Sequence, residues 1–429
     1  MTASATPEWA STAVRPGSTV GGPVALRPDL IIDGVADEPF GGHEIVLEGT
    51  QIAAVRPIRD DPGVAVVTLA GVTVVPGLID CHAHYMIDGS ADLDGIHQGD
   101  RDPVERVMLV GARNARTALR AGVTTARGAG SSRGLDIALA AGIDAGDIPG
   151  PRLLPAGPAI TITGGHGKPI GVEVDGIDRM ITAVRRAVRD GAQVIKLVAS
   201  EAAMLTTDRA AIPELSAAEM TALAAEAHRL RCTVLAHAQS SEAVRAAATA
   251  GVDSVEHAFL ADEEALRVLR DSGAFLTPTL AVTDVYSRLP GLSPAQRARQ
   301  ATLSVAHRRS CETAIRLGIP LATGTDCGVA GILPDMLGLE VALLAEHGLA
   351  PMNAIKAATS SAARLLGRSG ELGVLAPGAT ADLLAVPGNP LTDLRTLGEP
   401  TLVIKDGAVV HRRQAPLWPR DAHRPEQSH

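Results

Sequence analysis

The sequence predicts an α/β fold: a parallel barrel with a smaller β-rich unit beside it. Between residues 74 and 368, buried-strand patterns alternate with helical patterns in eight units, the order that produces a (β/α)8 barrel. Short strand patterns flank this region on both sides. The 429-residue chain is 46% hydrophobic, so it can bury a barrel of roughly 250 residues and a further unit. A doubly wound open sheet is the alternative, but no glycine-rich dinucleotide loop follows the first strand.

The two flanking regions are expected to form one small β-domain, from residues 23–73 and 369–413. In both regions short apolar runs alternate with turn residues, which is typical of antiparallel strands. The runs are Leu30–Ile32, Glu44–Glu48, Ile52–Val55, Ala381–Val386 and Leu402–Val410. Pairing rules allow the two ends to meet in one sheet, and the pattern does not prove that they do.

Composition limits the remaining classes of protein. Residues 1–22 are rich in Ser, Thr, Ala, Pro and Gly and lack a basic segment followed by an apolar one. We expect a disordered extension there and no signal peptide, with a flexible tail at residues 414–429. No run of about 18 apolar residues predicts a membrane span. The four cysteines lack finger-like spacing, which favours reduced thiols and a cytoplasmic location.

Charge and aromatic content argue against nucleic acid and anionic membranes as partners. The net charge is -9, no basic run occurs, and aromatic residues make up only 2% of the chain. A nucleic-acid surface needs basic side chains, and a single-strand platform also needs aromatic rings. We expect a small-molecule substrate instead, and a homo-oligomeric protein.

Between residues 74 and 368 the sequence predicts eight strands with helices between most of them. Candidate strands end near Asp80, Arg127, Gly157, Ser200, His237, His257, Pro278 and Asp326. Helical stretches between them include 104–121, 217–230, 242–250 and 294–317. Ser216 and Glu219 have the spacing of a capping box before the second of these helices. Glycines follow the other three, as at many helix ends.

The first strand of this series ends in two histidines. Val74–Asp80 is a short apolar, β-branched run, which predicts a buried strand. His82 and His84 follow, and residues two apart on a strand share a face. Both imidazoles can therefore converge on one metal ion. Alone, the pattern is weak, because surface histidines in a turn would have the same spacing.

Lys196 lies inside another buried-strand pattern, Val194–Val198. A buried ammonium is costly unless it is paired or neutralised. One interpretation is a lysine whose amine extends to the barrel mouth. The other is a lysine converted by carbon dioxide to a carbamate, which could bridge two metal ions.

Three more strand ends carry residues that bind metals or transfer protons. His237 and His257 end successive strands, and Asp326 ends the last one. Singly, each histidine could be a hydrogen-bonded core residue and the aspartate a turn or cap residue. Together, five of the eight predicted strand ends carry such a side chain. Barrel enzymes place their active sites at these ends, so we expect a metal site there, with Asp326 accepting a proton from a metal-bound water.

With these residues in this order, the chain resembles the amidohydrolase superfamily over nearly its whole length. Val75–His84 is similar to the first-strand signature of that superfamily, and Leu375–Leu383 resembles its segment re-entering the small β-domain. The order of Lys196, the two later histidines and Asp326 matches its binuclear members. The resemblance implies a distorted (β/α)8 barrel with a β-sandwich made from both chain ends.

The resemblance also implies two divalent metal ions, usually zinc, bridged by a hydroxide and by carboxylated Lys196. His82 and His84 would hold the first ion, and His237 and His257 the second. Asp326 would also contact the first ion. Such ions lower the pKa of bound water to about 7 and polarise a substrate carbonyl.

Two further segments resemble the prolidase-like branch, which includes relatives of imidazolonepropionase. They are Gly122–Gly130 and Thr161–Gly167. The resemblance implies that His166 faces the substrate; otherwise it is an incidental histidine in a glycine-rich turn. Arg127 is expected to pair with a substrate carboxylate or to be a structural cation near the barrel mouth.

The chain departs from this branch after the lysine strand, where Ala199–Ala203 replaces a frequent Gly-Gly pair. Glu201 brings a negative charge to the predicted pocket, which favours a cationic or neutral amide over a dipeptide carboxylate. The only tyrosines are Tyr85 and Tyr286. We expect Tyr85 to contact substrate, and the loops 85–102, 201–215 and 279–294 to form the pocket walls.

The predicted function is hydrolysis of an amide bond in a small substrate, such as an N-acyl amino acid, a dipeptide or a related amide. A cyclic-amide hydrolase or a deaminase on the same scaffold is the first alternative. Deaminase-type mononuclear sites generally lack a bridging lysine, so Lys196 favours a two-metal site. A catalytically silent scaffold protein is the second alternative, and the complete ligand set argues against it.

Overall fold

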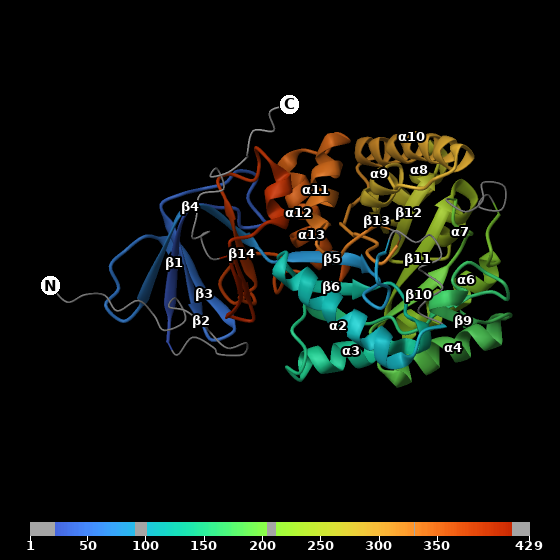
Figure 1. The fold of residues 1–429 in the computed structure, drawn as a ribbon, viewed down its shortest axis with the longest axis horizontal. Helices are drawn as coiled ribbons and strands as arrows, with labels where there is room; N and C mark the ends of the chain where they lie inside the picture. Colours follow the sequence, from blue (N-terminus) through green and yellow to red (C-terminus); the bar gives the residue numbers. More distant parts are fainter. Residues whose placement is uncertain (1–21, 91–100, 204–211, 330, 414–429) are drawn as a thin grey trace, which may run out of the picture.

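The computed structural model describes residues 22–90, 101–203, 212–329 and 331–413. It contains an α/β region of parallel strands surrounded by helices, and a separate sheet at one end (Figure 1). The expected terminal extension and tail, and parts of the expected pocket loops 85–102 and 201–215, lie outside the described residues. Among the helices of the described part, none is both long and apolar enough to span a membrane.

The separate sheet joins strands from both ends of the chain. Its order is β16-β15-β14-β4-β1-β2-β3, and β14 pairs antiparallel with β4. The strands are β1 (Val24–Ile31), β2 (His43–Glu48), β3 (Gln51–Pro57), β4 (Ala65–Pro76), β14 (Leu383–Pro387), β15 (Leu402–Lys405) and β16 (Ala408–Arg412). They form one continuous seven-stranded sheet, whereas a sandwich would have two. Apolar side chains of β1, β2, β4, β14 and β15 share one core.

The α/β region has two runs of paired strands. One has the order β5-β6-β7 and the other β13-β12-β11-β10-β8-β9, and the pairs within them are parallel. The strands are β5 (Leu78–Ala83), β6 (Val123–Gly128), β7 (Arg152–Leu154), β8 (Ala159–Thr161), β9 (Gly171–Glu173), β10 (Val194–Val198), β11 (Thr233–Ser240), β12 (Ser254–Leu260) and β13 (Phe275–Thr277). All side chains of β5, β6 and β10 are buried, as expected for parallel strands covered on both faces.

Helices follow most of these strands. They are α2 (Val104–Arg120), α3 (Leu135–Asp144), α4 (Ile177–Asp190), α6 (Ala217–Arg229), α7 (Ser241–Thr249), α8 (Glu263–Ser272), α9 (Leu280–Tyr286), α10 (Pro294–Leu317), α11 (Leu337–Glu346), α12 (Pro351–Ala357) and α13 (Ser360–Leu365). The capping box of Ser216 and Glu219 starts α6 as predicted. A second one, Ser293 with Gln296, starts α10, which ends at Gly318 with a φ of 73°. A positive φ suits glycine because it has no Cβ.

Two predicted strands differ from regular strands in the structure. The strand expected to end near Gly157 is divided into β7 and β8, because Pro155 and Pro158 each lack the N–H that a sheet ladder needs. The last predicted strand is an extended segment without a regular ladder. There the Asp80 carboxylate accepts hydrogen bonds from the backbone N–H of Thr325 (3.0 Å) and its hydroxyl (2.6 Å).

This extended segment hydrogen-bonds to strands on both sides. The N–H of Leu276 in β13 donates to the Pro320 carbonyl at 2.9 Å. On the other side, the N–H of Cys81 in β5 donates to the Thr323 carbonyl at 2.8 Å. The segment therefore connects the two runs of parallel strands and brings Asp326 beside β5.

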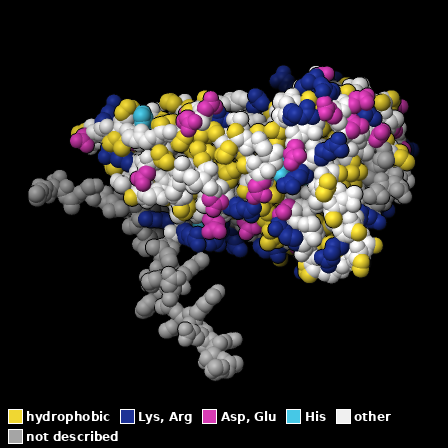
Figure 2. Space-filling model, turned by 90° about the horizontal axis from the view of Figure 1, so that it is seen from above, with side chains coloured by type: hydrophobic (Ala, Val, Ile, Leu, Met, Phe, Trp, Pro, Cys, Tyr) yellow, Lys and Arg dark blue, Asp and Glu magenta, His cyan; other side chains and the backbone are white. Residues whose placement is uncertain are grey.

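The charged surface has both signs. On the face in Figure 2, basic and acidic side chains are interspersed over both the sheet and the α/β region. A mixed surface of this kind differs from the continuous basic stripe typical of nucleic-acid binding.

Candidate active site

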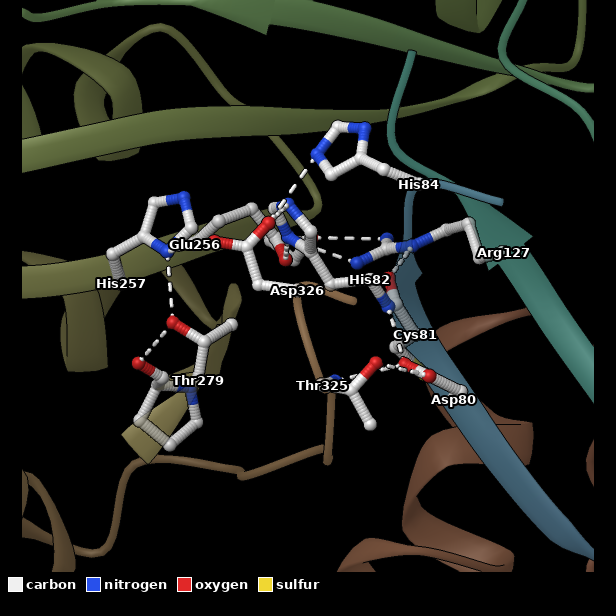
Figure 3. A network of polar contacts seen from close by, with 12 residues as sticks. Asp80, Cys81, His82, His84, Arg127, Glu256, His257, Thr279, Thr325 and Asp326 are labelled. Carbon is white, nitrogen blue, oxygen red and sulfur yellow. Dashed lines mark hydrogen bonds and ion pairs between the residues drawn. The ribbon is translucent and has the colours of Figure 1, made fainter. Parts of the chain in front are cut away.

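The six side chains predicted as metal ligands line one pocket at the carboxyl ends of the parallel strands. β5 supplies His82, and His84 directly follows its last residue. Lys196, His237 and His257 come from β10, β11 and β12. Asp326 comes from the extended segment, and Figure 3 shows it between His82, His84 and His257. The structure thus brings together residues that are up to 244 positions apart in the chain.

Short distances define the cluster. Asp326 Oδ1 lies 3.3 Å from Nε2 of both His82 and His84. One ligand atom from each of His82, His257 and Asp326 lies within 4.8 Å of the others. The rings of His237 and His257 have centroids 4.5 Å apart. These separations suit side chains that share metal ions.

The backbone around the cluster is strained. His257 and Asp326 have φ values of 75° and 56°, and Ala258 and Thr279 also have positive φ. For residues with a Cβ this conformation costs on the order of 1–3 kcal/mol each. It persists because the surrounding contacts hold it, and it aims the His257 and Asp326 side chains at the pocket.

Each of three histidines has its Nδ1 atom held by a neighbour. His82 Nδ1 lies 2.7 Å from a carboxylate oxygen of Glu256, and His84 Nδ1 lies 3.1 Å from the Gly130 carbonyl. His257 Nδ1 donates to the Thr279 hydroxyl at 2.8 Å, since that hydroxyl itself donates to the Pro278 carbonyl. Such contacts fix the tautomer and leave Nε2 free to bind a metal.

Two buried atoms of the pocket have no hydrogen-bond partner among the described residues: His237 Nε2 and Lys196 Nζ. Leaving a buried polar atom unpaired costs about 1–3 kcal/mol. These atoms converge on one pocket, where a ligand could satisfy them. Imidazole nitrogen and carboxylate oxygen are both ligands of divalent metals, so the residues present fit divalent ions.

Burial controls the charges of the cluster. It lowers the pKa of Lys196 to about 8 and lowers the pKa of His237 and His257 well below the ordinary value. The imidazoles are therefore neutral at pH 7, with lone pairs available. Burial alone would raise the pKa of Asp326, but the nearby histidines, above all His82, hold it well below its usual range.

Arg127 does not contact the pocket, contrary to its predicted role in binding a substrate carboxylate. Its guanidinium is fully buried and lies 2.9 Å from Glu256. It also donates to the Cys81 carbonyl at 2.6 Å and the Ser254 hydroxyl at 3.0 Å. Of the two interpretations given for Arg127, this geometry favours the structural cation. Arg127 positions Glu256, whose carboxylate holds His82 (Figure 3).

Glu256 is the functional residue that the sequence analysis missed. Burial raises the pKa of this carboxyl, but the Arg127 charge and the His82 hydrogen bond outweigh it and hold the pKa below its ordinary range. A glutamate in a predicted buried strand, directly before His257, could have indicated it. A carboxylate on a metal-binding histidine is a recurrent arrangement.

Tyr85, expected to contact substrate, lies in the core. Its ring belongs to the hydrophobic core, and it lies outside the pocket lining formed by the described residues. Tyr286 at the end of α9 lines the pocket instead, with Val282 of the same helix. The predicted wall at 279–294 therefore contributes to the pocket through a helix.

His166 lines the pocket as predicted, and Glu201 lies beside it. His166 Nδ1 is 3.6 Å from a Glu201 carboxylate oxygen, and the His166 backbone N–H donates to Glu214 at 2.9 Å. The rest of the lining is largely apolar: Ile170, Val198, Ala202, Phe259, Val282 and Val329. The site combines a buried polar cluster with an apolar wall.

The cysteines beside the cluster are not activated nucleophiles. All four cysteines of the chain are free and buried. Burial raises the pKa of Cys81 to about 12 and the pKa of Cys327 far above the ordinary thiol value. Nucleophilic cysteines have a lowered pKa.

Comparisons with known proteins show which families and structures the chain is similar to. The model of the amidohydrolase family matches residues 73–410. The ochratoxinase of Aspergillus niger is 31% identical over 386 residues, covering 82% of this chain and 78% of its own length. The imidazolonepropionase of Halobacterium salinarum is 26% identical over 379 residues, covering 82% and 85%. The solved structure of a Xaa-Pro dipeptidase with bound methionine superposes with a TM-score of 0.80 at 28% identity, covering 90% of this chain and 99% of its own.

Proposed function

The chain belongs to the amidohydrolase family, and on this premise we propose that it is a metal-dependent hydrolase of an amide bond in a small substrate. N-acyl amino acids, dipeptides and related amides are the substrate class. The observation that carries the proposal is the convergence of four histidines, Lys196 and Asp326 on one pocket, where Lys196 Nζ and His237 Nε2 are buried and have no hydrogen-bond partner among the described residues.

The proposed centre holds two divalent ions, with zinc as the expected metal. His82, His84 and Asp326 would bind the first ion, and His237 and His257 the second. Lys196, carboxylated by carbon dioxide, would bridge them; its lowered pKa supports this role because only the neutral amine reacts with carbon dioxide. When bound, such ions lower the pKa of water to about 7 and polarise a carbonyl oxygen.

Asp326 is the proposed acid–base residue. Its depressed pKa keeps the carboxylate ionised, so it can accept a proton from the attacking water and return it to the leaving amine. His166, at 3.6 Å from Glu201, would contact the substrate beside the scissile amide. The carboxylate of Glu201 would repel a substrate carboxylate beside His166. It therefore favours a cationic or neutral amide, or a substrate whose carboxylate lies elsewhere in the pocket.

We also propose that the two runs of parallel strands close into a distorted (β/α)8 barrel spanning residues 74–368, with 23–73 and 369–413 as the small β-domain. The hydrogen bonds of the 320–327 segment to both β13 and β5 support closure. Homo-oligomerisation, a cytoplasmic location, and the lack of nucleic-acid and membrane partners stay predictions from the sequence.

Hydrolysis of a cyclic amide is the second candidate function. The similarity to an imidazolonepropionase favours it. The buried lysine does not distinguish linear from cyclic amides, because both would be served by the same bridged ions. Relative rates on matched linear and ring amides would decide between the two.

The first experiment is elemental analysis of the purified protein and of Lys196→Ala, with Lys356→Ala as the control. Lys356 is a surface residue that pairs with Asp37 at 2.7 Å. We expect about two divalent ions per chain, a sharp fall in the Lys196 variant only, and hydrolysis within a panel of small amides. One ion that is indifferent to Lys196 would contradict the bridged centre, and no ion under metal-replete conditions would favour a silent scaffold.

A further inference from the structure

Gln239 lies in the pocket but has no part in the proposed metal centre. It follows His237 by two residues on β11, so both side chains lie on the same face of the strand. The residue is only 2% exposed and belongs to the pocket lining. The extra residue in the pairing of β11 with β12 lies on β12, since Ala238 pairs with His257 and Ser240 with Leu260, so β11 keeps its alternation.

Two hydrogen bonds fix Gln239 in place. Its backbone N–H donates to the Ser200 hydroxyl at 3.0 Å. Its side-chain Oε1 accepts from the Ala203 N–H at 2.6 Å. Because a backbone N–H can only donate, the atom facing it must be the amide oxygen, and the Nε2 group must point the other way.

The Nε2 group therefore presents two N–H donors, and none of the described residues accepts a hydrogen bond from them. The neighbouring lining is apolar, including Val198, Ala202 and Phe259. Donors held rigidly beside an apolar wall bind an acceptor strongly, since little conformational freedom is lost and the alternative is an unpaired polar group.

The scissile carbonyl is not the natural partner of these donors. Successive strand residues rise by about 3.3 Å, so Gln239 lies roughly 6.6 Å beyond His237 along β11. This distance corresponds to a second polar group of the substrate, a few bonds from the bond that is cleaved.

We propose that Gln239 determines specificity by donating to a second acceptor oxygen of the substrate, a carbonyl or carboxylate separated from the scissile amide. This inference rests on the proposed amide hydrolysis and narrows its substrate class. N-acyl amino acids and their amides would be preferred over simple N-acyl amines, whose leaving group carries no oxygen.

Three probes that differ only in the substituent carrying this oxygen test the proposal: N-acetyl-phenylalanine with a carboxylate, N-acetyl-phenylalaninamide with a carboxamide, and N-acetyl-2-phenylethylamine with a hydrogen. In Gln239→Met, which keeps the side-chain length and removes the donors, we expect kcat/KM to fall about tenfold or more for the first two probes, as for a lost hydrogen bond in a buried site. The third probe should change less than about twofold. Gln300→Met is the matched control, because Gln300 is also buried but lies on α10 outside the pocket lining.

Gln239→Glu separates the two kinds of acceptor. It keeps an oxygen for the Ala203 N–H and replaces the donors by a second oxygen, so it should penalise the carboxylate probe more than the carboxamide probe. Equal losses on all three probes in both Gln239 variants would overturn the proposal.

Calorimetric titration of the same probes gives a readout that does not require turnover. The wild-type protein should bind the two oxygen-bearing probes more tightly than the third, and Gln239→Met should abolish that preference. If the preference is present but no probe is hydrolysed, amide hydrolysis is refuted while the role of Gln239 stands. If the wild-type protein shows no preference, the role of Gln239 is refuted.

Discussion

Asp326 combines a strained backbone with contacts of 3.3 Å to Nε2 of both His82 and His84. Asp326→Asn keeps the shape of the side chain and removes its charge, so we expect a folded protein that retains most of its metal and loses kcat by at least about 100-fold, the usual contribution of an acid–base group. Elemental analysis and steady-state kinetics on one cleaved amide measure both quantities.

A matched control is Asp253→Asn. Asp253 is a partly exposed aspartate that pairs with His228 at 2.8 Å, outside the pocket lining. That variant should keep its turnover. Unchanged kcat in Asp326→Asn would mean that another group transfers the proton, and loss of metal would mean that Asp326 acts mainly as a ligand.

At the scale of single residues, the sequence predicted which side chains meet, and it mistook what some of them do. His82 and Lys196 could be placed because strand ends in a parallel sheet meet at one edge. Arg127 ends a strand as well, but the partner that turns it inward, Glu256, is 129 residues away. Sequence spacing carries no information about such a pair, and the same pattern fits a cation that faces the substrate.

At the scale of elements, helix α9 supplies Val282 and Tyr286 to the pocket, and a buried carboxylate holds its first turn. Glu340 of α11 accepts hydrogen bonds from the N–H groups of Leu280 (2.9 Å) and Ala281 (2.8 Å). Burial raises the pKa of Glu340 to about 8. The charge state of one side chain is therefore linked to the stability of a pocket wall.

The pH dependence follows from the sign of this shift. The pKa of Glu340 is near 4.5 in the unfolded chain and about 8 in the folded protein. Between these two pH values the folded state binds the Glu340 proton more tightly than the unfolded state does. Stability from this group is present at low pH and is lost as pH rises through that window, at up to about 1.4 kcal/mol per pH unit. We expect urea unfolding from pH 5 to 8 to show a shallower decline for Glu340→Gln than for the wild type.

Glu346→Gln controls for removal of a negative charge from the same helix. Glu346 is the last residue of α11, and its half-exposed carboxylate pairs with Arg395 at 2.6 Å. In Glu346→Gln the free energy of unfolding should change with pH as steeply as in the wild type. Identical slopes for the wild type and Glu340→Gln would show that Glu340 is ionised throughout the range.

Element boundaries were predictable where local chemistry sets them. The capping box before α6 and the glycine after α10 lie in the sequence itself. The irregular form of the last strand was not predictable. There the Asp80 carboxylate accepts hydrogen bonds from Thr325, whereas a regular ladder would join backbone groups of both strands. This side-chain contact joins residues that are 245 positions apart, and no local sequence pattern indicates it.

At the scale of the whole molecule, a partly buried ionic contact joins the seven-stranded sheet to the α/β region. Arg152 of β7 lies 2.9 Å from Asp382 and also pairs with Asp406. Asp382 is nearly buried and accepts the Asp406 backbone N–H at 2.8 Å. Asp382 directly precedes β14 and Asp406 lies between β15 and β16, so a single arginine connects two strand ends of one sheet to the edge of another.

Arg152→Met would keep most of the side-chain volume and leave the Asp382 carboxylate buried without its cation. Breaking a fully buried pair costs about 3 kcal/mol or more, and the partial exposure of Arg152 and Asp406 places this contact below that value. Because the contact joins two sheets, its loss should weaken their packing against each other. We expect calorimetry to show a lower Tm for the variant. We also expect its unfolding transition to be broader than that of the wild type, or divided in two. Arg189→Met, which removes an exposed partner of Asp190, should leave the transition unchanged, since surface pairs contribute little. A single transition shifted equally in both variants would mean that the two regions are held together by their apolar contacts alone.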